Sequence, residues 1–207
     1  QGISYVAARL LRWLGDEERA FWCMVQLVGE GRGDGLVPDD YYTTMLGVLV
    51  DQQVFADLLQ RALPLGISHL QELGGTGMEL PLMSTEWFLT LYSAPHNPAA
   101  AVAAVWDALF LLHSDQVLFA VGLAIMKLGL PDLLQARSHH EALASLQQLL
   151  TSRVEPRDST ALLREARAMA QIATPQAVQQ LREHHRPLVE AQMSMQAVNL
   201  DGAGGGS

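Results

Sequence analysis

Apolar residues recur at helical spacing along almost the whole chain of 207 residues. A typical stripe places Phe21, Met24, Val25 and Val28 at positions i, i+3, i+4 and i+7, on one face of a helix. Period-two alternation, the pattern of a half-buried strand, is nearly absent. No repeat of fixed period is present, which argues against a helical solenoid. We therefore predict an all-α fold, a compact multi-helix domain with short connections and no sheet.

Capping and breaking residues predict where these helices begin and end. Asp16, Ser114 and Thr174 are expected to cap helices, and Asn97-Pro98 offers a capping side chain followed by proline at the first helical position. Ser138 and Glu141 have the spacing of a capping box. The predicted helical segments are 6–14, 16–28, 46–50, 55–63, 69–73, 98–110, 115–128, 138–150, 159–172 and 175–186. A further helix is expected to start with residues 87–92. Pro81 is expected in a loop, and Gly129 and Pro131 are expected to end the segment 115–128.

Charge and composition exclude several classes of function. The formal net charge is −9, and the basic residues are scattered instead of forming a stripe, so we expect no nucleic-acid partner. The longest unbroken apolar run, Val117–Met126, is about half of the roughly 20 residues that a membrane-spanning helix needs. Cys23 is the only cysteine, which suits a reducing compartment. We expect a cytoplasmic protein that does not itself insert into a membrane.

The residues that could carry small-molecule chemistry do not form a recognisable site. The loop 29–35 has glycine at every second position, which matches neither a dinucleotide-binding motif nor a P-loop. The histidine pairs His139-His140 and His184-His185 are neighbours that point about 100° apart on a helix, so we expect solvated helix ends and no metal site. Tryptophans at 13, 22, 87 and 106 lie on apolar stripes and are expected to pack in the core. We expect no cofactor.

Several segments, read together, resemble the TBC domain, the GTPase-activating module for Rab-type small GTPases. Gln1-Gly2-Ile3 is similar to the end of the family's Y-x-Q-G-M segment, and Asp16–Trp22 follows at the right distance as D-E-E-R-A-F-W. Further blocks stand in the family's order at 50–54, 86–92, 105–111, 117–119 and 124–128. Each block is weak alone, but together they extend over about 150 residues.

The resemblance implies a mechanism with two side chains supplied to the GTP of a Rab-type partner. An arginine neutralises charge on the transferring phosphoryl group, and a glutamine, matched here by Gln1, positions the attacking water. GTP and Mg²⁺ would belong to the partner GTPase, and the partner could recruit the protein to a membrane in vesicle trafficking. The family's arginine lies in an I-x-x-D-x-x-R segment upstream of the glutamine, and this chain contains no such segment. We therefore expect the arginine upstream of this chain, and little activity from residues 1–207 alone.

The same resemblance predicts how the chain is divided. Residues 1–150 would form a TBC-like helical domain without its amino-terminal arginine part, and 151–200 would add carboxy-terminal helices that complete it. Residues 201–207 would be a flexible Gly-rich tail. The tyrosine two positions before the family's glutamine is missing, and Ile3 and Glu86 stand where methionine and glutamine are usual. A non-catalytic helical adaptor that binds a small GTPase or another protein remains the alternative.

Overall fold

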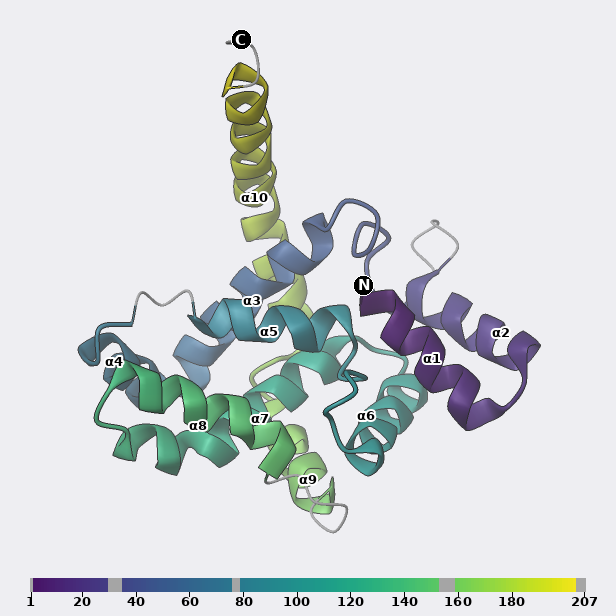
Figure 1. Cartoon of the computed structure of the whole chain (residues 1–207), viewed down its shortest axis with the longest axis horizontal. Coiled ribbons are helices and arrows are strands. Elements are labelled where there is room, and N and C mark those ends of the chain that lie inside the picture. Colours follow the sequence, from purple (N-terminus) through teal and green to yellow (C-terminus); the bar gives the residue numbers. More distant parts are fainter. Residues whose placement is uncertain (1, 30–34, 76–78, 153–158, 204–207) are drawn as a thin grey trace.

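The computed structural model describes residues 2–29, 35–75, 79–152 and 159–203, and these residues form ten α-helices and no strand. The all-α prediction is confirmed. Figure 1 shows the helices in chain order, which are α1 (Gly2–Leu14), α2 (Glu17–Val28), α3 (Leu46–Ala62), α4 (Pro64–Glu72), α5 (Glu79–Leu89), α6 (Ala99–Leu112), α7 (Gln116–Gln135), α8 (His139–Ser152), α9 (Ser159–Met169) and α10 (Pro175–Ala203). α10 extends into the segment 201–207, which was predicted as a tail.

α7 is the central helix of the core. It packs against α3, α4, α5, α6, α8 and α9, and its residues from Val117 to Met126 are all buried. By length and composition α7 could cross a membrane, which the unbroken apolar run alone did not indicate. However, 67% of that span is buried inside the protein, as expected for the central helix of a globular core.

Two prolines that were expected to lie outside helices lie within them. Pro81 falls in the first turn of α5, where the missing N–H would have no helical partner in any case. Pro131 lies inside α7, and the helix continues through it to Gln135. Its last part remains helical because α4 and α8 pack against α7 and Leu133 is buried there. The predicted helix end at Gly129 was therefore wrong.

Other helix boundaries also differ from the prediction. The segments 46–50 and 55–63 fall in one helix, α3, because Asp51, Gln52 and Val54 between them are buried instead of forming an exposed connection. The prediction that Trp87–Tyr92 starts a helix was wrong, since α5 ends at Leu89. Asn97 does not cap α6 either: the N-cap residue is Pro98, no side-chain hydrogen bond caps that end, and Asn97 Nδ2 donates instead to the Tyr92 carbonyl at 2.7 Å. The caps at Asp16, Ser138 and Thr174 are confirmed, each accepting a backbone N–H three residues later.

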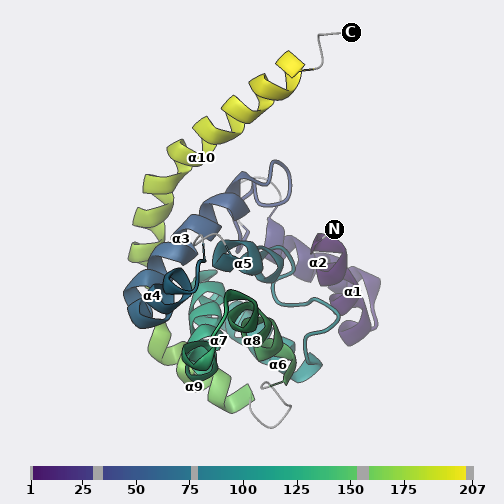
Figure 2. The same cartoon turned by 60° about the vertical axis from the view of Figure 1, so that its left-hand side comes forward.

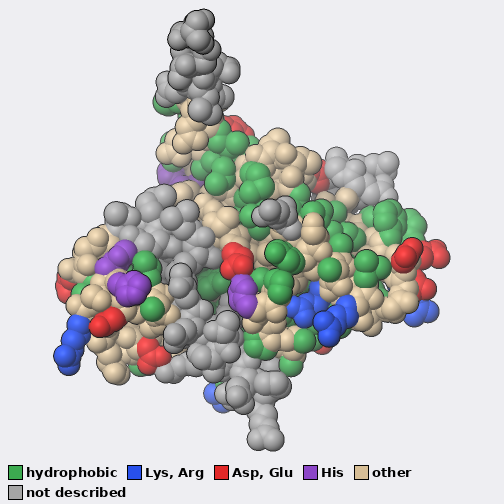
Figure 3. All heavy atoms as spheres, in the orientation of Figure 1, with side chains coloured by type: hydrophobic (Ala, Val, Ile, Leu, Met, Phe, Trp, Pro, Cys, Tyr) green, Lys and Arg blue, Asp and Glu red, His purple; other side chains and the backbone are tan. Residues whose placement is uncertain are grey.

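Burial divides the four tryptophans into two groups. Trp87 and Trp106 are 5% and 2% exposed, as predicted, but Trp22 is 55% exposed and Trp13 is 38% exposed. Phe21 beside Trp22 is also exposed, because α1 and α2 pack mainly on each other at one end of the molecule. Figure 3 shows hydrophobic side chains on the surface over this region.

α10 is attached to the body by polar contacts with α3, with the turn before α3 and with Asp115, the residue that precedes α7. Figure 2 shows α10 lying along α3 before its last turns extend away from the other helices. The guanidinium of Arg182 contacts both carboxylate oxygens of Asp51 at 2.7 Å and Asp115 Oδ2 at 2.6 Å. One turn later, His185 Nε2 is hydrogen-bonded to Asp57 Oδ2 at 2.9 Å, and Arg186 forms an ion pair with Asp40.

Arg182, Asp51 and Asp115 form a largely buried charged group, in which the side chains of Arg182 and Asp115 are each 18% exposed. Asp51 is 1% exposed and Arg182 also lies over the ring of Phe119, at 5.5 Å from its centroid. Burial acts to lower the pKa of Arg182, but the carboxylates of Asp51 and Asp115 outweigh it and raise the pKa above the ordinary arginine value. Burial raises the pKa of Asp51, and Arg182 opposes that shift. The group therefore connects α10 to α3 and to the start of α7. Each charge in it is stabilised by the opposite charge beside it.

Candidate functional site

The amino-terminal end of α1 lies against the carboxyl end of α5. Gly2, the first residue of α1, is buried, and its Cα faces the carbonyl group of Leu89, the last residue of α5. A Cβ added at Gly2 would lie 2.7 Å from the Leu89 carbonyl carbon and would overlap its oxygen. The approach is therefore possible only for glycine. Figure 1 shows these two helix ends side by side.

Tyr42, in the turn before α3, holds the same carbonyl from another direction. Its hydroxyl donates to the Leu89 carbonyl oxygen at 3.1 Å. Burial raises the pKa of Tyr42 well above that of a free phenol, so the hydroxyl keeps its proton at physiological pH. We refer to Gly2, Tyr42 and the Leu89 carbonyl as the Leu89 seat.

The turn that follows α5 is strained and strongly anchored. Leu91 and Tyr92 have φ angles of 47° and 64°, a conformation that costs non-glycine residues about 1 kcal/mol or more each. The Trp106 indole N–H donates to the Leu91 carbonyl at 2.7 Å, and Asn97 Nδ2 donates to the Tyr92 carbonyl. These bonds from α6 and its approach fix the backbone directly after the Leu89 seat.

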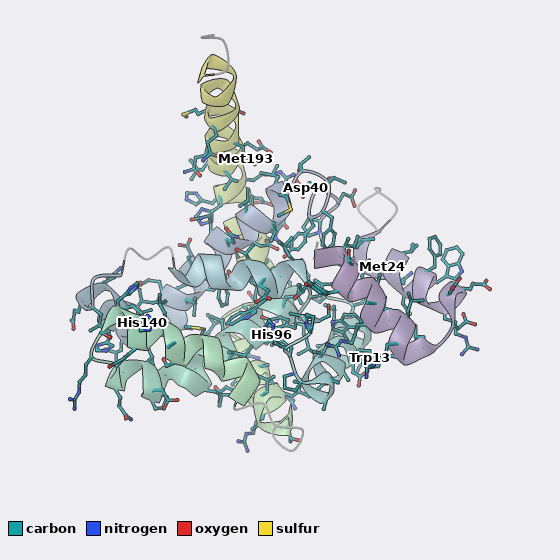
Figure 4. The ribbon with its side chains drawn as sticks, viewed as in Figure 1. Trp13, Met24, Asp40, His96, His140 and Met193 are labelled. Atoms are coloured by element: carbon teal, nitrogen blue, oxygen red, sulfur yellow. The ribbon has the colours of Figure 1, made fainter. Side chains whose placement is uncertain are left out.

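Arg9 attaches the middle of α1 to this turn. Its guanidinium donates to the carbonyls of Ser93 and Ala94, at 3.2 and 3.4 Å, and lies over the ring of Trp13. Trp13 meets Trp106 edge to face at 5.3 Å between ring centroids, and Figure 4 shows Trp13 on the side of α1 that faces α6. Burial, followed by the charge of Arg12, lowers the pKa of Arg9, which stays a cation at neutral pH. α1 is thus held at its start by the carboxyl end of α5, in its middle by the turn after α5, and near its far end by Trp106 of α6.

Gln1, the predicted finger residue, lies outside the described residues, as does most of the Gly-rich loop, residues 30–34. The structure describes its neighbour Gly2. Glu86, where the family usually has glutamine, is on α5 and lies 3.6 Å from His96 Nε2. Gln1 therefore stays a prediction.

The histidine pairs are not arranged as metal ligands. Among the residues that the structure describes, no group of three His, Cys, Asp or Glu side chains could hold a metal ion. His184 and His185 lie in the middle of α10, not at a helix end as predicted, and His185 is engaged with Asp57. Asp39 and Asp40 lie in the turn before α3. Figure 4 shows Asp40 beside α10, where Arg186 reaches it.

A stability measurement can test the close approach at Gly2. Alanine favours a helix over glycine by about 1 kcal/mol, so Gly2→Ala would stabilise an unobstructed helix. Here the added Cβ meets backbone, and we expect Gly2→Ala to destabilise the protein by about 1–3 kcal/mol in urea unfolding. Ser4→Ala, on the exposed side of the same turn, is the control and should be neutral or slightly stabilising. A stabilised Gly2→Ala protein would contradict the contact with Leu89.

Comparison with known proteins places this chain in a family. The family model for the Rab-GTPase-TBC domain matches residues 1–134, a range that begins at Gln1-Gly2 and includes the Leu89 seat. The chain is 33% identical over 201 residues to TBC1 domain family member 2A of Rattus norvegicus, covering 93% of this chain and 20% of that protein. It is 35% identical over 138 residues to Growth hormone-regulated TBC protein 1 of Xenopus laevis, covering 67% of this chain and 37% of that protein.

A third relative has higher identity over a shorter range. Carabin of Mus musculus is 43% identical over 126 residues, which is 60% of this chain and 26% of that protein. The chain thus spans between about a fifth and a little over a third of the length of these curated relatives. What the comparisons identify is the domain.

Proposed function

This chain belongs to the Rab-GTPase-TBC domain family, and we propose that it stimulates GTP hydrolysis by a Rab-type small GTPase, with Gln1 as a finger residue. The observation that supports this most is the start of α1. The Q-G of the family motif is present, and its glycine is the residue whose missing side chain lets α1 lie against Leu89. A helix end that is fixed this closely suits a side chain that has to act at a defined point.

The proposed chemistry follows from the glutamine side chain. Its amide oxygen can accept a hydrogen bond from the attacking water, while its amide nitrogen donates to an oxygen of the γ-phosphoryl group. The water attacks phosphorus, the bond to the β-phosphate oxygen breaks, and GDP and phosphate leave. An arginine that neutralises the charge developing on the phosphoryl oxygens would come from upstream of Gln1.

The other components of the reaction belong to the partner. GTP and its Mg²⁺ would be bound by the GTPase, and this chain would bring no cofactor of its own. We further propose that the protein is cytoplasmic and reaches a membrane through its GTPase. The net charge of −9 supports a protein partner over nucleic acid.

Single-turnover GTP hydrolysis by a panel of purified Rab GTPases tests the proposal. We expect the natural-length protein to accelerate hydrolysis by at least one member about 10³–10⁵-fold, the range typical of an arginine finger. Residues 1–207 alone should accelerate it far less. Tight binding of a GTPase without acceleration by the natural-length protein would instead support the adaptor alternative.

A further inference from the structure

We propose that Tyr42 is a positioning residue for Gln1, acting through the carbonyl of Leu89. The inference rests on the proposed function, and it adds a residue that lies on a different element, 47 residues from the acceptor of its hydrogen bond. Tyr42 does not touch the GTPase in this proposal. Its hydroxyl sets the position of the group on which the first residue of α1 packs.

The Leu89 carbonyl is a group that the helix itself leaves free. The last carbonyls of an α-helix have no partner within the helix and must bond elsewhere. Here those of Glu86, Trp87 and Phe88 accept the N–H groups of Thr90, Tyr92 and Leu91 in the following turn, at 2.9–3.2 Å. The Leu89 carbonyl instead accepts the Tyr42 hydroxyl, a donor that belongs to the turn before α3.

Gly2 links the position of the Leu89 carbonyl to the position of α1. With no side chain between them, the backbone of Gly2 rests directly on the Leu89 carbonyl, so a shift of the carbonyl moves the start of α1. Gln1 is bonded to Gly2 and shares this displacement. Because a misplacement of about 1 Å in a reacting group can cost a factor of 10² in rate, a small shift is enough to be measured.

The rest of α1 would stay in place if Tyr42 lost its hydroxyl. Val6 and Leu10 are 0% and 3% exposed, and Arg9 bonds the carbonyls of Ser93 and Ala94. These contacts hold α1 further along its length. The effect of Tyr42 is therefore confined to the end of the helix that carries Gln1.

Tyr42→Phe in the natural-length protein tests the proposal. We expect kcat for stimulated hydrolysis to fall about 10-fold, while KM and GTPase affinity stay within about 2-fold of the parent. Tyr41→Phe is the matched control, because it removes the hydroxyl of the neighbouring tyrosine, which is also buried but lies near Asp51 and Arg182 instead of the Leu89 carbonyl. Its kcat should stay at the parent value even if its melting temperature falls by as much as that of Tyr42→Phe.

The double variant with Gln1→Ala separates positioning from a general loss of structure. If Tyr42 acts through Gln1, Tyr42→Phe should reduce kcat no further once Gln1 is alanine. Full activity of Tyr42→Phe beside an impaired Gln1→Ala protein would overturn the role of Tyr42 and leave the proposed function standing. An equal loss from Tyr42→Phe in both backgrounds would also overturn it. Absence of acceleration by the parent protein would overturn the proposed function, and this inference with it.

Discussion

Arg182→Ala is expected to lower the free energy of unfolding by about 3–5 kcal/mol, the usual cost of removing one partner from a buried ion pair. The loss is large because the substitution leaves Asp51, which is 1% exposed, with a buried carboxylate whose bidentate partner has gone. Asp115 loses the same partner. α10 would then be attached to α3 mainly by the pairs of His185 and Arg186. Urea unfolding followed by circular dichroism measures the change.

Arg186→Ala provides the control one turn further along α10. The Arg186 side chain is 47% exposed, so water screens its pairs with Asp40 and Glu190 and a loss of about 1 kcal/mol or less is expected. If Arg182→Ala costs no more than Arg186→Ala, the buried group does not hold α10 in place. The truncation also removes the packing of Arg182 over Phe119, so Arg182→Met, which keeps much of the side-chain volume, should be included.

Most of the fold was predictable because helical periodicity and capping residues are local signals. The predictions failed where tertiary burial outweighs a local rule. Pro131 would normally end a helix, but α7 continues because its last part is covered by other helices. A helix-breaking residue indicates the free-energy cost of continuing the helix at that position. The packing that offsets this cost comes from residues far away in the sequence, so a local pattern does not detect it.

Exposure was less predictable than helix position. Phe21 and Trp22 lie on a helix with apolar periodicity, yet they are 59% and 55% exposed. Periodicity identifies the apolar face of a helix without showing whether another element covers it.

The site could be predicted only in part. Gln1 was identified through its resemblance to a family motif, which depends on residue types and their order. The contribution of Tyr42 could not be found in this way, because its partner is a backbone carbonyl that has no signature in the sequence. Arg182 did leave a signal, since it shares a helical stripe with Val178, Leu181 and Val189, all buried. A charged residue within an apolar stripe indicates a buried partner.

The effect of Gln1→Ala on stimulated GTP hydrolysis, measured beside GTPase binding, tests the central claim most directly. Glutamine would act on the transition state by positioning water, so its loss should lower the rate about 10–10³-fold in the natural-length protein. Binding should change little, because a protein interface is spread over many residues and one amide contributes a small part of it. A Gln1→Ala protein that accelerates hydrolysis as well as its parent, for every GTPase on which the parent acts, would show that Gln1 is not a finger.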